Sequence, residues 1–231
     1  MHKLGKYKET DSMSFLISDS YRILLVMSRF GIGLGLGDKT IGDVCLENGV
    51  DAKTFLIIVN MLLDEDGLID YSKGEISMES LLFYLHNSHD YFLDFKLPAI
   101  RKELVDIMDL QPGELSQAVV RYFDEYVSEV RKHMMYEEET VFPYVRALIN
   151  GEKSNKYNIN IFRTQHDQVE LKLHEFKNIL IKYYPAKSTN QINSLLFDIF
   201  TCEYDLASHN AIEDRLFVPV VTEYEQSLMK K

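Results

Sequence analysis

One short pattern occurs twice in this chain, and it restricts what the chain can fold into. A histidine precedes a glutamate by four residues at His133 and Glu137, and again at His209 and Glu213, and in both copies a proline stands six residues after the glutamate. Residues four apart share one face of an α-helix. A single pair of this kind is also common on helix surfaces, but both copies lie among apolar residues, where an unpaired His or carboxylate is costly. The repeat therefore predicts two helices that bring their pairs together in a protein interior.

The rest of the chain after residue 75 is also helical in pattern. Four long stretches are predicted as helices, over residues 78–108, 114–149, 159–184 and 188–225. The breaks between them are marked by Pro112-Gly113, Asn150-Gly151 and Pro185. Pro143 should kink the second helix or end its regular part. Long helices joined by short loops predict an all-α fold, an up-down-up-down four-helix bundle over residues 75–231.

Residues 1–74 predict a small helical N-terminal domain. Helices are expected over 14–30, 40–45 and 51–65, with Asp51 as the N-cap of the last. A glycine-rich turn over residues 31–37 is not a phosphate-binding loop, because it lacks the Lys-Ser/Thr ending and follows a helix rather than a strand.

Charge and composition exclude several function classes. The net charge of -11 opposes binding to nucleic acid and to anionic membranes. No apolar run approaches the length of a membrane span, and the first residues lack the apolar core of a signal peptide, so we expect a cytoplasmic protein. Cys45 and Cys202 are the only cysteines, and in a reducing compartment they are expected to be free, packed thiols.

The predicted bundle offers histidines on its other two helices as well. His89 and His166 complete a candidate metal-binding set whose other members are His133, Glu137, His209 and Glu213. His86 competes with His89, because both lie on the same helix face. Imidazole and carboxylate suit iron, manganese or zinc, and the lack of thiolates disfavours a structural zinc. Six side chains exceed the needs of one four-coordinate ion, and with a bridging oxygen they give roughly ten of about twelve bonds to two octahedral ions. Two metal ions with open positions are therefore predicted.

These segments resemble a known family. H-M-M-Y-E-E-E-T-V-F-P and H-N-A-I-E-D-R-L-F-V-P are similar to the paired segments of hemerythrin-like (HHE) domains, as are T-Q-H-D-Q and the H-D-Y-F segment that ends in K-L-P. The arrangement most closely resembles the branch called repair of iron centres. The resemblance implies that Glu137 and Glu213 bridge two iron ions. It also implies that His89 and His133 bind one iron, and that His166 and His209 bind the other.

The same resemblance implies a function. It implies an oxo- or hydroxo-bridged di-iron site that supports recovery of damaged iron–sulfur proteins under nitrosative and oxidative stress. The donor chemistry of this chain leaves manganese as the alternative metal. O2, NO or a related small molecule would be the ligand. The oligomeric state stays open, and a homodimer is one option. One departure is that Gly35 and Leu36 stand where the family usually has adjacent cysteines. This departure favours an alternative, a di-iron O2 or NO sensor without turnover. A third hypothesis is a helical interaction protein without metal.

Overall fold

The fold is all-α in the computed structural model, which describes residues 6–64, 76–152, 157–164, 167–185 and 187–229. Contacts divide the chain into two compact units, Met1–Ser88 with Arg215–Val220, and His89–Asp214 with Val221–Lys231. The boundary predicted near Gly74 lies outside the described residues and stays a prediction. Across the described ranges, no helix is long and apolar enough to cross a membrane.

The N-terminal part forms short helices, as predicted. They are α1 (Met13–Asp19), α2 (Ile23–Arg29), α3 (Ile41–Glu47) and α4 (Ala52–Leu63). Asp51 caps α4 by accepting a hydrogen bond from the Thr54 N–H at 2.8 Å, which confirms the predicted N-cap. The single helix expected over residues 14–30 is wrong. The chain is extended at Ser20, where a polar Ser-Asp-Ser run ends α1, because such side chains compete for backbone hydrogen bonds.

The glycine-rich segment between α2 and α3 is a loop, as expected. Gly31 and Gly35 adopt φ angles of 72° and 93°, which L-residues with a side chain rarely adopt. Cys45 and Cys202 are buried thiols outside any disulfide, as predicted, and burial raises the pKa of Cys45 to about 12. Neither thiol is therefore placed for exchange chemistry.

Four long helical segments follow, and three of them contain a π-helical piece. The first consists of α5 (Met78–Asp90), η1 (Tyr91–Lys96) and α6 (Leu97–Met108). The second consists of α7 (Glu114–Tyr136), η2 (Glu137–Val141) and α8 (Phe142–Ile149). The third consists of the 3-10 helix η3 (Ile159–Thr164) and α9 (Asp167–Tyr183), and the fourth of α10 (Thr189–Ile212), η4 (Glu213–Phe217) and α11 (Val218–Met229). The breaks at Pro112-Gly113, Asn150-Gly151 and Pro185 are confirmed.

Each π-helical piece lies just before a proline. The Leu97 N–H donates to the Phe92 carbonyl, and the Phe142 N–H donates to the Glu137 carbonyl, so both bonds span five residues instead of four. Proline has no N–H and its ring crowds the carbonyl four residues earlier. The wider turn accommodates both effects, so the helix continues through Pro143 rather than ending there.

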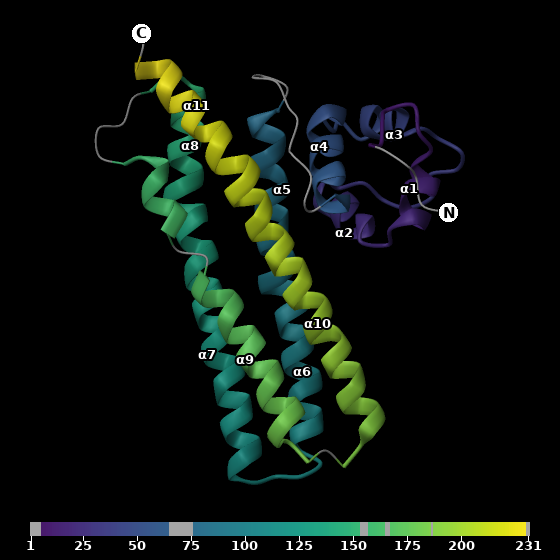
Figure 1. The fold of residues 1–231 in the computed structure, drawn as a ribbon, viewed down its shortest axis with the longest axis vertical. Helices are drawn as coiled ribbons and strands as arrows, with labels where there is room; N and C mark the ends of the chain where they lie inside the picture. Colours follow the sequence, from purple (N-terminus) through teal and green to yellow (C-terminus); the bar gives the residue numbers. More distant parts are fainter. Residues whose placement is uncertain (1–5, 65–75, 153–156, 165–166, 186, 230–231) are drawn as a thin grey trace. The chain divides into compact units, whose positions relative to one another are not determined.

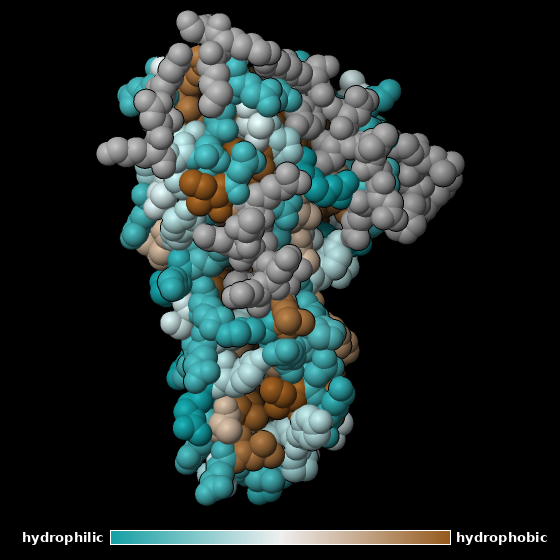
Figure 2. Space-filling view, turned by 60° about the vertical axis from the view of Figure 1, so that its left-hand side comes forward, coloured by the Kyte–Doolittle hydropathy of each residue, from teal (hydrophilic) through white to brown (hydrophobic). Residues whose placement is uncertain are grey.

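Four helices pack in the ring that an up-down-up-down bundle requires. α6 packs against α7 and α10, and α9 packs against the same two helices, as Figure 1 shows. Hydrophilic side chains cover most of the bundle face in Figure 2, with smaller hydrophobic patches between them. The interior is a continuous apolar core supplied by η1, α6, α7, α9 and α10, with Phe123, Tyr126, Phe176, Leu195 and Ile199 among its members.

Substitution of Phe123 tests the location of this core. It is fully buried and its ring lies 5.1 Å from that of Phe176. Phe123→Ala should lower the free energy of unfolding by about 3–5 kcal/mol, because it removes a large apolar side chain and leaves a cavity. Phe197→Ala is the matched control: that ring is 74 % exposed, so its loss should change stability by less than about 0.5 kcal/mol. Urea unfolding followed by circular dichroism measures both, and equal losses would contradict this location of the core.

Candidate metal centre

The two His–Glu pairs adopt the same geometry. The distance from His133 Nε2 to Glu137 Oε1 is 3.0 Å, and that from His209 Nε2 to Glu213 Oε1 is 3.1 Å. This confirms that four-residue spacing puts each pair on one helix face. In each copy the histidine belongs to a regular α-helix and the glutamate is the first residue of a π-helical piece.

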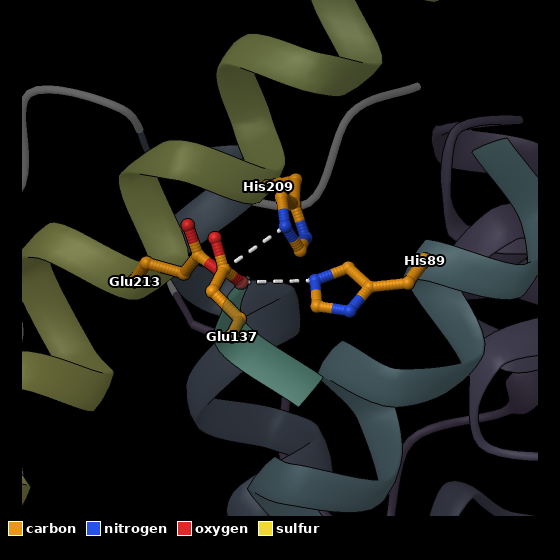
Figure 3. A group of neighbouring side chains, drawn as sticks. All are labelled: His89, Glu137, His209 and Glu213. Atoms are coloured by element: carbon orange, nitrogen blue, oxygen red, sulfur yellow. Dashed lines mark ion pairs between the residues drawn. The ribbon is translucent and has the colours of Figure 1, made fainter. Parts of the chain in front are cut away.

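The structure brings four of the six predicted residues into one buried cluster. His89, Glu137, His209 and Glu213 each offer a ligand atom, and these atoms lie within 4.8 Å of one another (Figure 3). Both glutamates are fully buried, and the two histidines are at most 2 % exposed. His133 lies against Glu137 at the edge of the cluster. His166 lies outside the described residues, so its predicted role is untested.

His89, not His86, faces the carboxylates. The distance from its Nε2 to Glu137 Oε2 is 3.0 Å. His86 is not part of the cluster found among the described residues and is only partly buried. The structure thus favours His89 in the pair that the sequence left open.

The donor atoms of the cluster are close without being hydrogen bonded. Within the described part of the chain, His89 Nε2, both His209 ring nitrogens and both Glu137 carboxylate oxygens have no hydrogen-bond partner, although some lie about 3 Å from one another. Buried polar atoms in proteins are nearly always satisfied. Imidazole nitrogens and carboxylate oxygens gathered within 4.8 Å of one another are ligand atoms that a metal ion accepts, so the donor set fits a bound metal.

Charge leads to the same conclusion. Glu137 and Glu213 place two carboxylates close together in a water-free interior, which is unfavourable unless a cation compensates them. In the metal-free chain, part of that compensation comes from His89. Burial alone would lower the pKa of His89, but Glu137 and Glu138 outweigh it and raise the pKa to about 10. A metal ion would replace this proton as the positive charge of the site.

Glu138, which from sequence could equally be a solvated residue or a partner of the ligands, contacts His89. Its Oε1 accepts a hydrogen bond from His89 Nδ1 at 2.7 Å, so this carboxylate fixes the tautomer that leaves Nε2 free for a metal. Helix periodicity gives no signal for the contact, because Glu138 points about 100° away from Glu137 on its own helix. The contact depends on where α5 packs.

Aromatic rings line the cluster and exclude water. The rings of His89 and Phe142 are stacked at 5.4 Å, and the ring of Phe92 meets that of His209 edge-on at 5.8 Å. Phe162 is stacked against His133 at 6.4 Å. The cluster therefore lies in a largely apolar environment.

Comparison with known proteins agrees with this geometry. The hemerythrin HHE cation-binding domain matches residues 81–221, which contain all six predicted ligands. A comparison with curated proteins gives no matching relative.

The first prediction for the site concerns its carboxylates. Glu137→Ala and Glu213→Ala should each lose most of the bound metal, because each removes a buried charged ligand. Glu139→Ala is the control, since Glu139 lies on the same turn as Glu137 but is exposed. Metal analysis after Fe(II) loading and desalting measures the effect, with circular dichroism to verify the helices. Similar metal content in all three variants would show that these carboxylates are not ligands.

The second prediction concerns Glu138. Glu138→Ala should weaken metal affinity by about 10–100-fold, because His89 loses the carboxylate that orients it. Competition with a coloured chelator gives the affinity. An affinity equal to that of Glu139→Ala would refute the orienting role.

Proposed function

Because the chain belongs to the hemerythrin HHE cation-binding domain family, we propose that its buried cluster holds two iron ions and supports repair of iron–sulfur clusters. The observation that carries the proposal is the convergence of His89, Glu137, His209 and Glu213, four buried side chains whose ligand atoms lie within 4.8 Å of one another. His133, and His166 by its resemblance to the family, would complete the set. Manganese is the alternative metal that the same donors suit.

Each ligand would have a distinct role. Glu137 and Glu213 would be the two central carboxylate ligands, and the resemblance to the family implies that they bridge the ions; both are fully buried and each lies about 3 Å from a histidine of its own helix. His89 would bind through Nε2 while Glu138 holds its Nδ1–H. Iron bound in this way supplies one-electron chemistry and open positions for O2 or NO.

The surroundings suit a small apolar gas more than a charged substrate. The rings of Phe92, Phe142 and Phe162 contact the histidines, and Ile212, which precedes Glu213 in the chain, is fully buried. A ligand that enters this environment must lose its hydration, which is cheap for NO or O2 and costly for an ion. This preference supports a role in nitrosative and oxidative stress in the cytoplasm, with damaged iron–sulfur proteins as clients.

Burial of the two cysteines favours a second candidate function, a sensor of NO or O2. Cys45 and Cys202 are at most 1 % exposed, so thiol exchange with a client is not available to them. A sensor that binds NO or O2 reversibly at the same site needs no such thiol. The two functions differ only in turnover.

The test is metal content followed by repair. The full chain loaded with iron should retain about two irons and show a near-ultraviolet band from the bridged pair. Added to an iron–sulfur protein whose cluster NO has damaged, it should restore the cluster absorbance, whereas Glu213→Ala should not.

Three other outcomes are informative. No iron after reconstitution would contradict the proposal as a whole. Two irons without cluster recovery, but with reversible NO binding, would identify the sensor. Full recovery by Glu213→Ala would show that the repair does not depend on this site.

A further inference from the structure

Three tyrosines form a connected group that begins at the residue before Glu137. Tyr136 ends α7 and directly precedes Glu137. Its hydroxyl donates a hydrogen bond to the Tyr157 hydroxyl at 3.2 Å. The Tyr157 ring in turn meets the Tyr144 ring edge-on, with centroids 4.8 Å apart. The three rings thus link the residue next to Glu137 to helix α8.

The group ends at a buried carboxylate. The Tyr144 hydroxyl donates to Glu225 Oε1 at 2.5 Å, and the Ile159 N–H donates to the same oxygen at 2.8 Å. Glu225 is only 8 % exposed and belongs to α11, which Figure 1 shows near α8 at one end of the bundle. A carboxylate held this way is an acceptor already in place for the phenolic proton.

We propose that Tyr144 and Tyr157 donate electrons to the metal centre when it meets a hydroperoxide, with Tyr136 as the link and Glu225 as the acceptor of the Tyr144 proton. The inference rests on the proposed iron site. A phenol gives up an electron readily only if it gives up its proton at the same time. The Tyr144–Glu225 contact provides that proton transfer over one short hydrogen bond.

The reaction balances with hydrogen peroxide as the oxidant. Each of two tyrosines loses one electron and one phenolic proton and becomes a neutral phenoxyl radical. The Tyr144 proton passes to Glu225, and the Tyr157 proton passes to solvent, because Tyr157 is only partly buried. The peroxide takes the two electrons together with two protons from solvent, its O–O bond breaks, and two water molecules form. The tyrosines would thus take the oxidising equivalents that otherwise attack the histidine ligands.

The electrostatic environment supports this function. Burial, followed by the hydrogen bond with Glu225, raises the pKa of Tyr144, and burial and Tyr136 raise that of Tyr157. Both phenols are therefore protonated at neutral pH. The Glu137 carboxylate makes the smallest contribution to the rise in the pKa of Tyr157.

The experiment is freeze-quench electron paramagnetic resonance on the full chain. Protein whose iron content has been measured is mixed with hydrogen peroxide and frozen. The wild-type chain should give a tyrosyl radical signal, and metal-free protein should give none. Tyr144→Phe combined with Tyr157→Phe should lose the signal at unchanged iron content, since only hydroxyl groups are removed. Tyr183→Phe is the control, because that ring is 68 % exposed on α9, and its signal should equal that of the wild type.

Glu225→Gln keeps the side-chain volume and tests the proton acceptor. Its signal should be weaker than that of the wild type, because glutamine cannot take the Tyr144 proton. A full iron load without a radical, or an undiminished radical in the double variant, would overturn this inference alone. A chain that binds no iron would overturn the proposed function and this inference together.

Discussion

Two carboxylates buried side by side are the constraint on which this structure depends. Glu137 and Glu213 are fully enclosed, and each lies about 3 Å from a histidine of its own helix. Such an arrangement is unfavourable in an apolar interior unless positive charge is supplied. Protons on histidine can supply part of it, and metal ions can supply all of it. The bundle is therefore a scaffold that holds negative charge where water cannot reach it, and cation binding follows from that.

The prolines explain how the helices deliver these ligands. A π-helical piece begins at Glu137 and another at Glu213, and each ends shortly before a proline. One additional residue in the turn shifts the phase of everything that follows. The α-helical segments before and after each π-helical piece can then both turn their apolar faces towards the interior. One unbroken α-helix would not align both faces in this way. The hydrogen bond that each proline removes from its helix is thus lost next to the site, where the wider turn helps to orient the glutamate.

Sequence reasoning recovers the parts of this design that are local. Pro112-Gly113 and Asn150-Gly151 end helices through their own backbone preferences, and the four-residue spacing of His133 and Glu137 determines their shared face. Sequence reasoning fails for contacts that only tertiary packing determines. The contact of Glu138 with His89 joins two helices that only packing brings together, and the π-helical pieces depend on five-residue bonds that no apolar periodicity reveals.

Two other results show the same limit. The helix break at Ser20 arises from a short polar run. This run hardly disturbs the helical pattern of apolar residues on either side, so the pattern alone did not predict the break. The tyrosine group is invisible in sequence, because Tyr144 and Glu225 belong to different helices and meet only in the folded chain. The general metal-binding assignment, in contrast, needed only the repeat of one short pattern and the match of the family over residues 81–221.

The apolar core has a consequence for how the ions could come and go. The core between α6, α7, α9 and α10 is built from hydrophobic side chains such as Phe123, Phe176 and Leu195. Their burial stabilises the fold by removing apolar surface from water, which does not depend on an ion. Small domains that fold only around zinc have no such core. At the proposed site, an ion could therefore enter a bundle that this core already holds together.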